Sequence, residues 1–242
     1  MRVRGGQNVF GHSVGILMLD TRFPRIPGDM GNAGTFDFPV RYHRVDGASP
    51  DRVVRKGPRE LLDDFVDGAR VLEREGVRAI TTNCGFLAQF QEELAAAVSV
   101  PVFTSSLLLV PLVHRMLAPG RAVGVMTVDA SSLRPAHYAG AGITGAMPVV
   151  VAGLETEKEF TRVLLDDELE LDVEACRAEH RAVASRLVAA HPEIGAIVLE
   201  CTNMPPYRAD IQAVTGLPVF DVTTLVRMVH DAIRHGLPPR PA

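Results

Sequence analysis

The sequence predicts an α/β protein whose strands form parallel sheets. Short apolar runs alternate with amphipathic helical stretches along the 242 residues, and this alternation is typical of strand–helix–strand units. Two of the apolar runs lead into a cysteine, at Cys84 and Cys201. The same number of residues, 17, separates Cys84 from Pro101 and Cys201 from Pro218. These observations together predict a duplicated α/β unit.

The first third of the chain begins with an expected strand. Val14–Leu19 is continuously apolar, as is usual for a strand that is covered on both faces. A loop of about twenty residues rich in glycine and proline follows, and loops of that length are commonly functional or disordered. The next expected strand is Pro39–Val45. Apolar residues share one helical face over Arg59–Glu75, and Gly76 ends that helix.

The rest of the chain continues the alternation of short apolar runs and helical stretches. The further expected strands are Val77–Thr82, Val100–Thr104, Ala122–Val128, Pro148–Val151, Ile194–Leu199 and Val219–Phe220. The further expected helices are Phe86–Val98, Leu107–Leu117, a helix beginning over Ser132–Tyr138 with a hydroxyl cap, Glu157–Leu165, Val173–Ala190, one around Ala209–Val214, and Thr224–His235.

A second pair of matching segments supports the duplication. Val14–Asp20 reads VGILMLD and Val123–Asp129 reads VGVMTVD, so both have the pattern V-G-aliphatic-aliphatic-x-aliphatic-D. We therefore divide the chain into a first α/β domain, residues 1–108 plus 216–242, and a second, residues 109–215. Loops at the carboxyl ends of parallel strands lie at the edge where ligands bind. Two such edges that face each other would bring Cys84 and Cys201 to opposite walls of one cleft.

Two facing thiols are suited to proton transfer at a carbon next to a carboxylate. One thiolate can remove a proton while a thiol on the other side returns one. The thiol pKa of about 8.5 is close to neutrality and falls at a helix N-terminus. Both cysteines precede a predicted helix, so we expect its amides and dipole to favour the thiolate. The alternatives are two buried core cysteines or a Cys84–Cys201 disulfide; Cys176, within a helix, is expected to be an inert packing residue.

Composition excludes several classes of function. The net charge is −4 without a basic block, so neither nucleic acid nor an anionic membrane is an expected partner. No apolar run approaches the ~20 residues of a membrane span, and the first residues lack the apolar segment of a secretory signal. Three cysteines without disulfide spacing favour a reducing, cytoplasmic compartment.

The segment Leu199–Pro205, LECTNMP, resembles the second-cysteine motif of the aspartate/glutamate racemase superfamily. The resemblance extends from Val14 to about His235. It implies two pseudo-symmetric, Rossmann-like or flavodoxin-like domains with the active site in the interdomain cleft. It also implies a cofactor-independent enzyme in which Cys84 and Cys201 are the acid/base pair. We expect a small carboxylate substrate and a homodimer or a larger homo-oligomer.

The resemblance also suggests which residues contact the substrate. Asn83 and Thr202 would bind its carboxylate or amine. The full set of expected substrate-binding residues is Asp20, Asn83, Gly85, Phe86, Ser105, Thr127, Thr202 and Asn203. Phe86 and Tyr207 could wall the cleft, and Arg22, Arg25 or Arg41 could meet a carboxylate.

Three functions remain open from the sequence. The first is a racemase or epimerase of a small carboxylate, such as the amino acids aspartate or glutamate. The second is a lyase, because the loop from Pro27 to Val40 looks like one shared with dimethylsulfoniopropionate lyases of the superfamily; these remove the same proton and then expel a leaving group. The third is a non-catalytic protein that binds small carboxylates. Asn203 stands where the aspartate and glutamate racemases usually have histidine.

Other motifs carry less weight. Gly11–Gly15 fits G-x-S-x-G, but the expected strand follows Ser13 instead of preceding it, which disfavours a nucleophile elbow. Neither Lys56 nor Lys158 is a convincing pyridoxal-phosphate lysine. The eight histidines form no metal-binding spacing. We therefore expect no cofactor and no metal.

Overall fold

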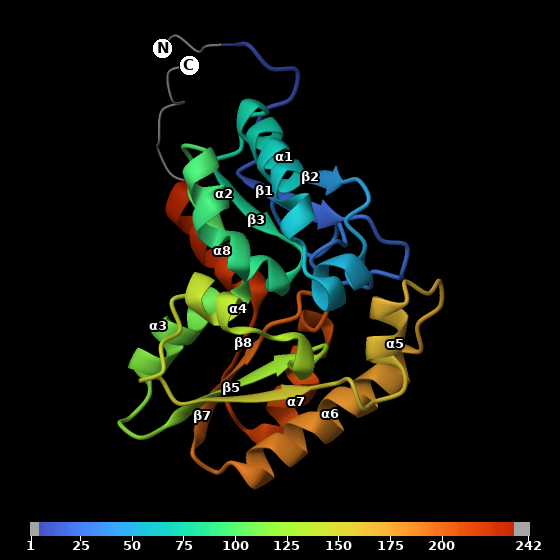
Figure 1. Cartoon of the computed structure of the whole chain (residues 1–242), viewed down its shortest axis with the longest axis vertical. Coiled ribbons are helices and arrows are strands. Elements are labelled where there is room, and N and C mark those ends of the chain that lie inside the picture. Colours follow the sequence, from blue (N-terminus) through green and yellow to red (C-terminus); the bar gives the residue numbers. More distant parts are fainter. Residues whose placement is uncertain (1–4, 235–242) are drawn as a thin grey trace.

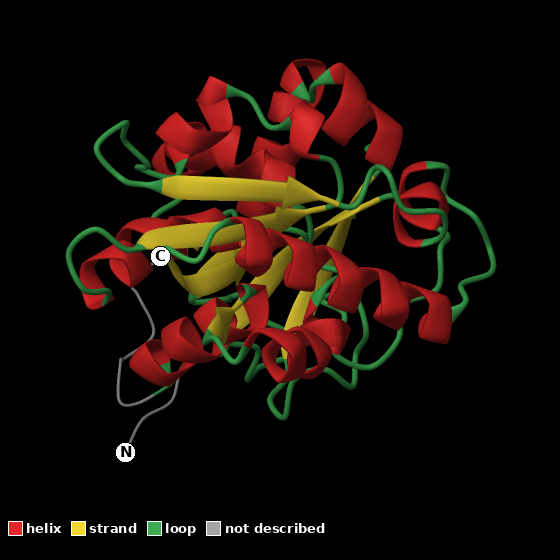
Figure 2. Cartoon of the chain, turned by 90° about the horizontal axis from the view of Figure 1, so that it is seen from below, coloured by secondary structure: helices red, strands yellow, loops and turns green. Residues whose placement is uncertain are grey.

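A computed structural model describes residues 5–234. The predicted helix end at His235 and the predicted domain limits at residues 1 and 242 lie outside this range. Two parallel four-stranded sheets, one in the upper and one in the lower part of Figure 1, form the framework. Helices lie on both sides of the strands (Figure 2). The predicted α/β class, with two pseudo-symmetric parallel-sheet units, is confirmed.

The strands are short, and the inner strands of the two sheets, β1, β3, β5 and β7, are almost entirely buried, as their apolar runs predict. The first sheet contains β1 (Val14–Leu19), β2 (Val40–Val45), β3 (Ala79–Thr82) and β4 (Val102–Phe103). The second sheet contains β5 (Ala122–Thr127), β6 (Val149–Gly153), β7 (Ile194–Leu199) and β8 (Val219–Phe220). We call the sheet of β1–β4 with α1, α2 and α8 the N-terminal lobe, and the sheet of β5–β8 with the remaining helices the C-terminal lobe.

The helices follow the predicted order, and all except α6 start at a shifted residue. They are α1 (Leu62–Arg74), α2 (Gln91–Ala97), α3 (Leu109–Met116), α4 (Pro135–Gly140), α5 (Phe160–Leu165), α6 (Val173–Ala190), α7 (Arg208–Thr215) and α8 (Val222–Ile233). Tight 3₁₀ turns over Arg59–Leu61, Gly85–Phe90, Ser106–Leu108 and Pro205–Tyr207 precede α1, α2, α3 and α7. A π-helical turn over Asp51–Lys56, which the sequence did not predict, buries Val53 and Val54.

The two lobes have the same topology. Their strand orders are β2-β1-β3-β4 and β6-β5-β7-β8, with all neighbours parallel. The matching segments Val14–Asp20 and Val123–Asp129 thus contain the corresponding strands β1 and β5. This equivalence places the residues after β3 and after β7 at corresponding points, each at the carboxyl edge of its sheet.

The predicted domain boundary at residue 216 is too early. β8 pairs with β7 and completes the second sheet, with Ile197 opposite Val219. The chain returns to the first lobe only with α8, which contacts β3. β8 is the counterpart of β4 in the repeat, so the boundary between the two lobes lies after β8.

The hydrophobic core runs across both lobes. Alternate side chains of each strand point to opposite faces of its sheet. Val14 and Ile16 therefore join one buried cluster that also holds Val123 and Val125, while Leu17 and Met126 belong to the other cluster. Each cluster covers one face of both sheets, so the two lobes share their core.

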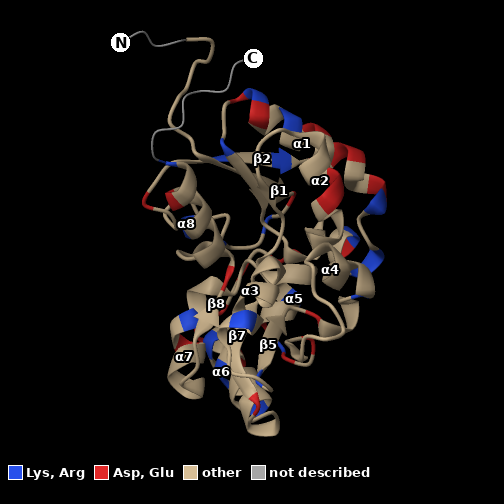
Figure 3. Cartoon of the chain, turned by 90° about the vertical axis from the view of Figure 1, so that its left-hand side faces the viewer, with Lys and Arg blue, Asp and Glu red and all other residues tan. Residues whose placement is uncertain are grey.

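Charged side chains lie mainly on the outer helices, such as α1 and α2, while the strands carry few of them (Figure 3). Within residues 5–234, no helix combines the length and the apolar character that crossing a bilayer requires.

Candidate active site

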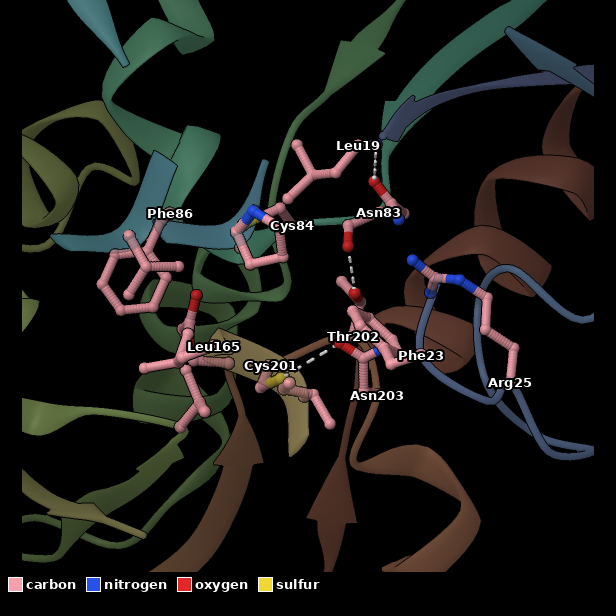
Figure 4. Close-up of a pocket in the computed structure, with 16 residues that line it drawn as sticks. Leu19, Phe23, Arg25, Asn83, Cys84, Phe86, Leu165, Cys201, Thr202 and Asn203 are labelled. Carbon is pink, nitrogen blue, oxygen red and sulfur yellow. Dashed lines mark hydrogen bonds between the residues drawn. The ribbon is translucent and has the colours of Figure 1, made fainter. Parts of the chain in front are cut away.

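The two cysteines that follow β3 and β7 line the same pocket. Cys84 and Cys201 are each 7% exposed and neither is in a disulfide. The pocket and the open solvent at its mouth together contain about 370 Å³ of space free of protein atoms. Figure 4 shows Cys84 and Cys201 coming from different lobes toward this space.

Equivalent backbone hydrogen bonds hold the two strand ends. The amide of Asn83, the residue before Cys84, donates to the Leu17 carbonyl at 2.9 Å. The amide of Glu200, the residue before Cys201, donates to the Met126 carbonyl at 2.8 Å. Leu17 and Met126 occupy the same position in β1 and β5, so an equivalent backbone hydrogen bond positions each cysteine.

Burial keeps both thiols protonated. Desolvation, followed by the nearby Glu200 carboxyl, raises the pKa of Cys84 to about 12. The backbone amides of Phe86 and Leu87 and the Arg25 guanidinium lower that pKa, but by less. Burial and Glu200 also raise the pKa of Cys201 well above its usual range, and Asp29 adds to the rise. Burial and Glu200 therefore outweigh the lowering of the thiol pKa that helix dipoles were expected to give. The segments that follow the cysteines contain short 3₁₀ turns.

Asn83 lines the pocket and carries a buried donor without a partner. Its Oδ1 accepts a hydrogen bond from the Leu19 amide at 2.7 Å. Its Nδ2 is buried without a partner. The carbonyl of Asn83 accepts a hydrogen bond from Thr202 Oγ1, so this threonine joins the lobes and its hydroxyl is already engaged. A buried amide donor without a partner costs free energy unless a ligand satisfies it.

Glu200 is a site residue that sequence reasoning missed. It is fully buried and lines the pocket. Its Oε2 accepts a hydrogen bond from Thr127 Oγ1 at 2.6 Å, while its Oε1 has no partner. Desolvation raises the pKa of this carboxyl to about 7, against the lowering by Thr127. The sequence shows a glutamate at a strand end, where such side chains are usually in water, so nothing local signals its burial.

A polar network anchors the long loop between β1 and β2 at the pocket. Arg25 donates to Asp29 Oδ1 at 2.9 Å and to Thr21 Oγ1 at 2.8 Å. Asn203 donates through Nδ2 to Asp29 Oδ2 at 2.5 Å, and Cys201 donates through Sγ to Asn203 Oδ1 at 3.6 Å. Arg25 lines the pocket, as Figure 4 shows. Arg25 thus braces the loop internally, and Asn203 ties it to the C-terminal lobe.

The remaining wall is apolar and contains two aromatic rings. The residues concerned are Leu19, Phe23, Pro50, Val54, Phe86, Val128, Leu164 and Leu165. The ring of Phe86 meets His137 edge-on, with 5.2 Å between centroids. Gly85 is also part of the wall, and a Cβ at this position would collide with the Glu200 carboxyl and backbone oxygens. Only glycine therefore lets the two strand ends approach this closely.

Five of the expected substrate-binding residues, Asn83, Gly85, Phe86, Thr202 and Asn203, lie in the wall, and three do not. The Asp20 carboxylate accepts from the Gly47 amide and pairs with Arg44. Ser105 caps the turn before α3 by accepting from the Leu107 amide. Thr127 lies behind Glu200 as its hydrogen-bond donor. These three side chains are engaged elsewhere and do not line the pocket.

Tyr207, Arg22 and Arg41, which the sequence suggested as possible wall or carboxylate-binding residues, do not line the pocket. Tyr207 stacks on His180 with 4.3 Å between ring centroids, behind the pocket. Arg22 pairs with Asp167, and Arg41 pairs with Glu75. Of the three arginines weighed, Arg25 is therefore the one in the wall. Within the described part of the chain, no group of three or more His, Cys, Asp or Glu is arranged to hold a metal ion.

A family model described as Asp/Glu/Hydantoin racemase matches residues 47–228. The chain belongs to this family. Solved structures of racemase-family enzymes share its fold. A glutamate racemase from Bacillus anthracis superposes with a TM-score of 0.63 at 14% identity, covering 92% of this chain and 83% of that one. Unliganded arylmalonate decarboxylase superposes with a TM-score of 0.57 at 17% identity, covering 96% of both chains.

Curated relatives with higher identity carry a different activity in their names. A dimethylsulfoniopropionate lyase from Durusdinium sp. clade D is 33% identical over 241 residues, covering 95% of this chain and 79% of its own. Dimethylsulfoniopropionate lyase 7 from Emiliania huxleyi is 32% identical over 221 residues, covering 88% of this chain but only 64% of its own length. The expectation of an amino-acid racemase is therefore wrong. The lyase alternative, raised from the loop over 27–40, agrees with these relatives.

Proposed function

We propose that this family member is a lyase that removes the proton α to a carboxylate and expels a leaving group from the β-carbon. The natural first candidate is dimethylsulfoniopropionate. The observation that carries the proposal is the pair of thiols in one pocket of a chain that is 33% identical to a dimethylsulfoniopropionate lyase. Elimination needs only one base, and the two cysteines are not equivalent.

Cys84 is the better candidate for the base. The amides of Phe86 and Leu87 and the guanidinium of Arg25 all favour its thiolate. The Asn203 amide favours the Cys201 thiolate, whereas Asp29 and Cys84 oppose its ionisation. In the proposed step the Cys84 thiolate takes the α-proton and the C–H electron pair becomes the new C=C bond. The C–S pair leaves with sulfur as neutral dimethyl sulfide, and acrylate remains.

Arg25 and Asn83 are suited to holding the substrate carboxylate. The guanidinium is positively charged and lines the pocket, and Asn83 Nδ2 is a buried donor without a partner. Donors on the carboxylate also stabilise the charge that develops there as the α-proton leaves. The Phe86 ring in the opposite part of the wall can favour a sulfonium through cation–π attraction.

The proposal is tested by incubating the protein with dimethylsulfoniopropionate. Dimethyl sulfide is measured in the headspace and acrylate in solution. We expect equal amounts of both, with loss of activity in Cys84→Ser and retention in Cys176→Ser, a change of the buried cysteine of α6. Absence of both products, or full activity of Cys84→Ser, would refute the proposal.

The three cysteines of the chain are free, which suits a reducing compartment. We therefore also propose a cytoplasmic location, which fractionation of the source cells would test.

A further inference from the structure

The buried carboxyl of Glu200 has no role in the elimination as described. Glu200 lies in the wall with its Oε1 unpaired and its Oε2 held by Thr127. Its carboxyl lies against Gly85, the residue after Cys84, because a Cβ there would collide with it. The carboxyl therefore reaches across from the C-terminal lobe to the turn that carries the first cysteine. It also acts electrostatically on both thiols.

The elimination requires a proton acceptor besides the substrate. Cys84 is buried and protonated, so its proton must leave the sulfur before that sulfur can act as a base. The charged and titratable groups that face this part of the pocket are Cys84, Cys201, Arg25 with its partner Asp29, and, from α4, Tyr138, whose pKa Glu200 helps to raise. Asp29 is engaged by Arg25 and Asn203. Glu200 is the acidic group of this set with an unpaired oxygen.

We propose that Glu200 accepts the proton of the Cys84 thiol, so that one negative charge moves between the carboxyl and the sulfur. This inference rests on the proposed elimination for its place in the reaction. It makes Glu200 a residue that acts through Cys84 and does not itself touch the substrate.

The proton balance closes over one turnover. The Glu200 carboxylate and the Cys84 thiol become a carboxylic acid and a thiolate. The thiolate then takes the α-proton and is a thiol again as the leaving group departs. Glu200 returns its proton to solvent, which matches the one proton that the elimination releases. The like charge on Glu200 disappears at the moment when the thiolate forms, so the repulsion that opposes Cys84 ionisation disappears with it.

Alkylation kinetics test the transfer without any substrate. The wild type and Glu200→Gln are treated with iodoacetamide from pH 5 to pH 10, and the modified cysteines are resolved by peptide mass spectrometry. Gln keeps an oxygen that can accept from Thr127, so the fold is preserved. Glu174→Gln, an exposed carboxyl at the start of α6, is the matched control.

In the wild type we expect Cys84 alkylation to rise to a plateau with a midpoint near pH 7, where Glu200 ionises. In Glu200→Gln the rate of Cys84 alkylation should not show this rise, the pH limb near pH 7. At pH 7.5 Cys84 of this variant should react at least about tenfold more slowly than in the wild type. Thr127→Val removes the donor that lowers the Glu200 pKa, so the midpoint should move to higher pH. A carboxylate that only repels the thiolate predicts the opposite: Glu200→Gln would then react faster at neutral pH, and that result would overturn the proposal. An unchanged limb in Glu200→Gln would overturn it as well.

Lyase assays on the same proteins separate the two proposals. A loss of about 10²-fold or more in kcat/KM for Glu200→Gln, with loss of the rise in rate near pH 7, would support both. A wild type that shows the alkylation limb but releases no dimethyl sulfide would end the proposed function and leave the proton transfer standing.

Discussion

The two lobes hold their cysteines in the same way but differ in the residue that precedes each one. Asn83 and Glu200 donate equivalent backbone hydrogen bonds to Leu17 and Met126. Each side chain then has one atom engaged by its own lobe and one left unpaired in the buried site. The unpaired atom is an amide donor in the first lobe and a carboxyl oxygen in the second. A symmetric scaffold therefore holds one end suited to binding an anion and one suited to exchanging a proton.

The environments of the two sulfurs follow this difference. Cys84 has two backbone amides and Arg25 in favour of its thiolate, whereas Cys201 is opposed by Asp29 as well as by Glu200. The chemistry of elimination, which removes one proton and returns none to carbon, suits such an unequal pair.

The largest expected effect comes from replacing each cysteine in turn. Removing a general base typically costs 10²–10⁴-fold in rate. We expect Cys84→Ser to lower kcat/KM for dimethyl sulfide release by about 10³-fold or more, and Cys201→Ser by only about 10-fold to 100-fold. Equal losses in the two variants would show that the two cysteines contribute alike and would contradict the assignment of Cys84 as the base.

The second effect is the pH dependence of stability that Glu200 contributes in the C-terminal lobe. The folded-state pKa of Glu200 is raised from 4.5 to about 7, so the folded protein holds this proton more tightly. Its contribution to stability is present at low pH and is lost as pH rises from about 4.5 to about 7, by about 3 kcal/mol in total.

Urea denaturation of the wild type and Glu200→Gln at pH 4.5 and pH 8 measures this contribution. The variant should gain about 3 kcal/mol relative to the wild type between these pH values. His180, whose pKa is lowered to about 4, gives a slope of opposite sign, but it is present in both proteins and cancels. Asn83→Ala is the matched control, and its difference from the wild type should not vary with pH. A constant difference for Glu200→Gln would contradict the expectation.

The third change makes the two lobes more alike. Asn83→Asp would replace the unpaired donor by a carboxylate oxygen, which repels the substrate carboxylate. We expect KM for dimethylsulfoniopropionate to rise about tenfold or more, with a smaller change in kcat, as is usual for a group that binds the ground state and the transition state alike. An unchanged KM in steady-state assays would show that Asn83 does not bind the carboxylate.

The smallest effect concerns the link between the lobes. Thr202→Val removes the hydroxyl that donates to the Asn83 carbonyl and leaves that buried oxygen unpaired. The free energy of unfolding should fall by about 1–2 kcal/mol in urea denaturation. Thr215→Val is the matched control, because Thr215 donates to the Ile211 carbonyl within α7 and is less buried. A larger loss for Thr215→Val would mean that the link between lobes adds no more than a local contact.

Much of the fold could be predicted because its signals are local. Continuous apolar runs identify the strands, and the bounds of β7 and α6 were predicted without error. The π-helical turn over Asp51–Lys56 was missed because its two buried valines stand among charged residues without a period. The strand Val219–Phe220 was predicted, but the boundary near residue 216 put it in the wrong lobe, because its pairing with β7 decides which sheet it joins.

The site was predictable only in part. The two cysteines could be paired because the repeat places them at equivalent strand ends. Glu200 and Arg25 could not be singled out in the same way, because each reaches the pocket through contacts between distant segments. Asp20, Ser105 and Thr127 were expected at the substrate because they adjoin strand ends, but their side chains serve neighbouring loops, a turn and Glu200. The homo-oligomer stays a prediction.

The loop between β1 and β2 has a consequence for how this protein could be recombined with its relatives. Although it is encoded with the N-terminal lobe, it fits the other one: the Met30 amide donates to the Thr202 carbonyl, Asn203 donates to Asp29, and the Gly28 backbone lies against Pro206. A chimera cut between the lobes would separate these partners. The exchangeable module is therefore discontinuous, and residues 26–35 have to be inherited together with residues 202–206.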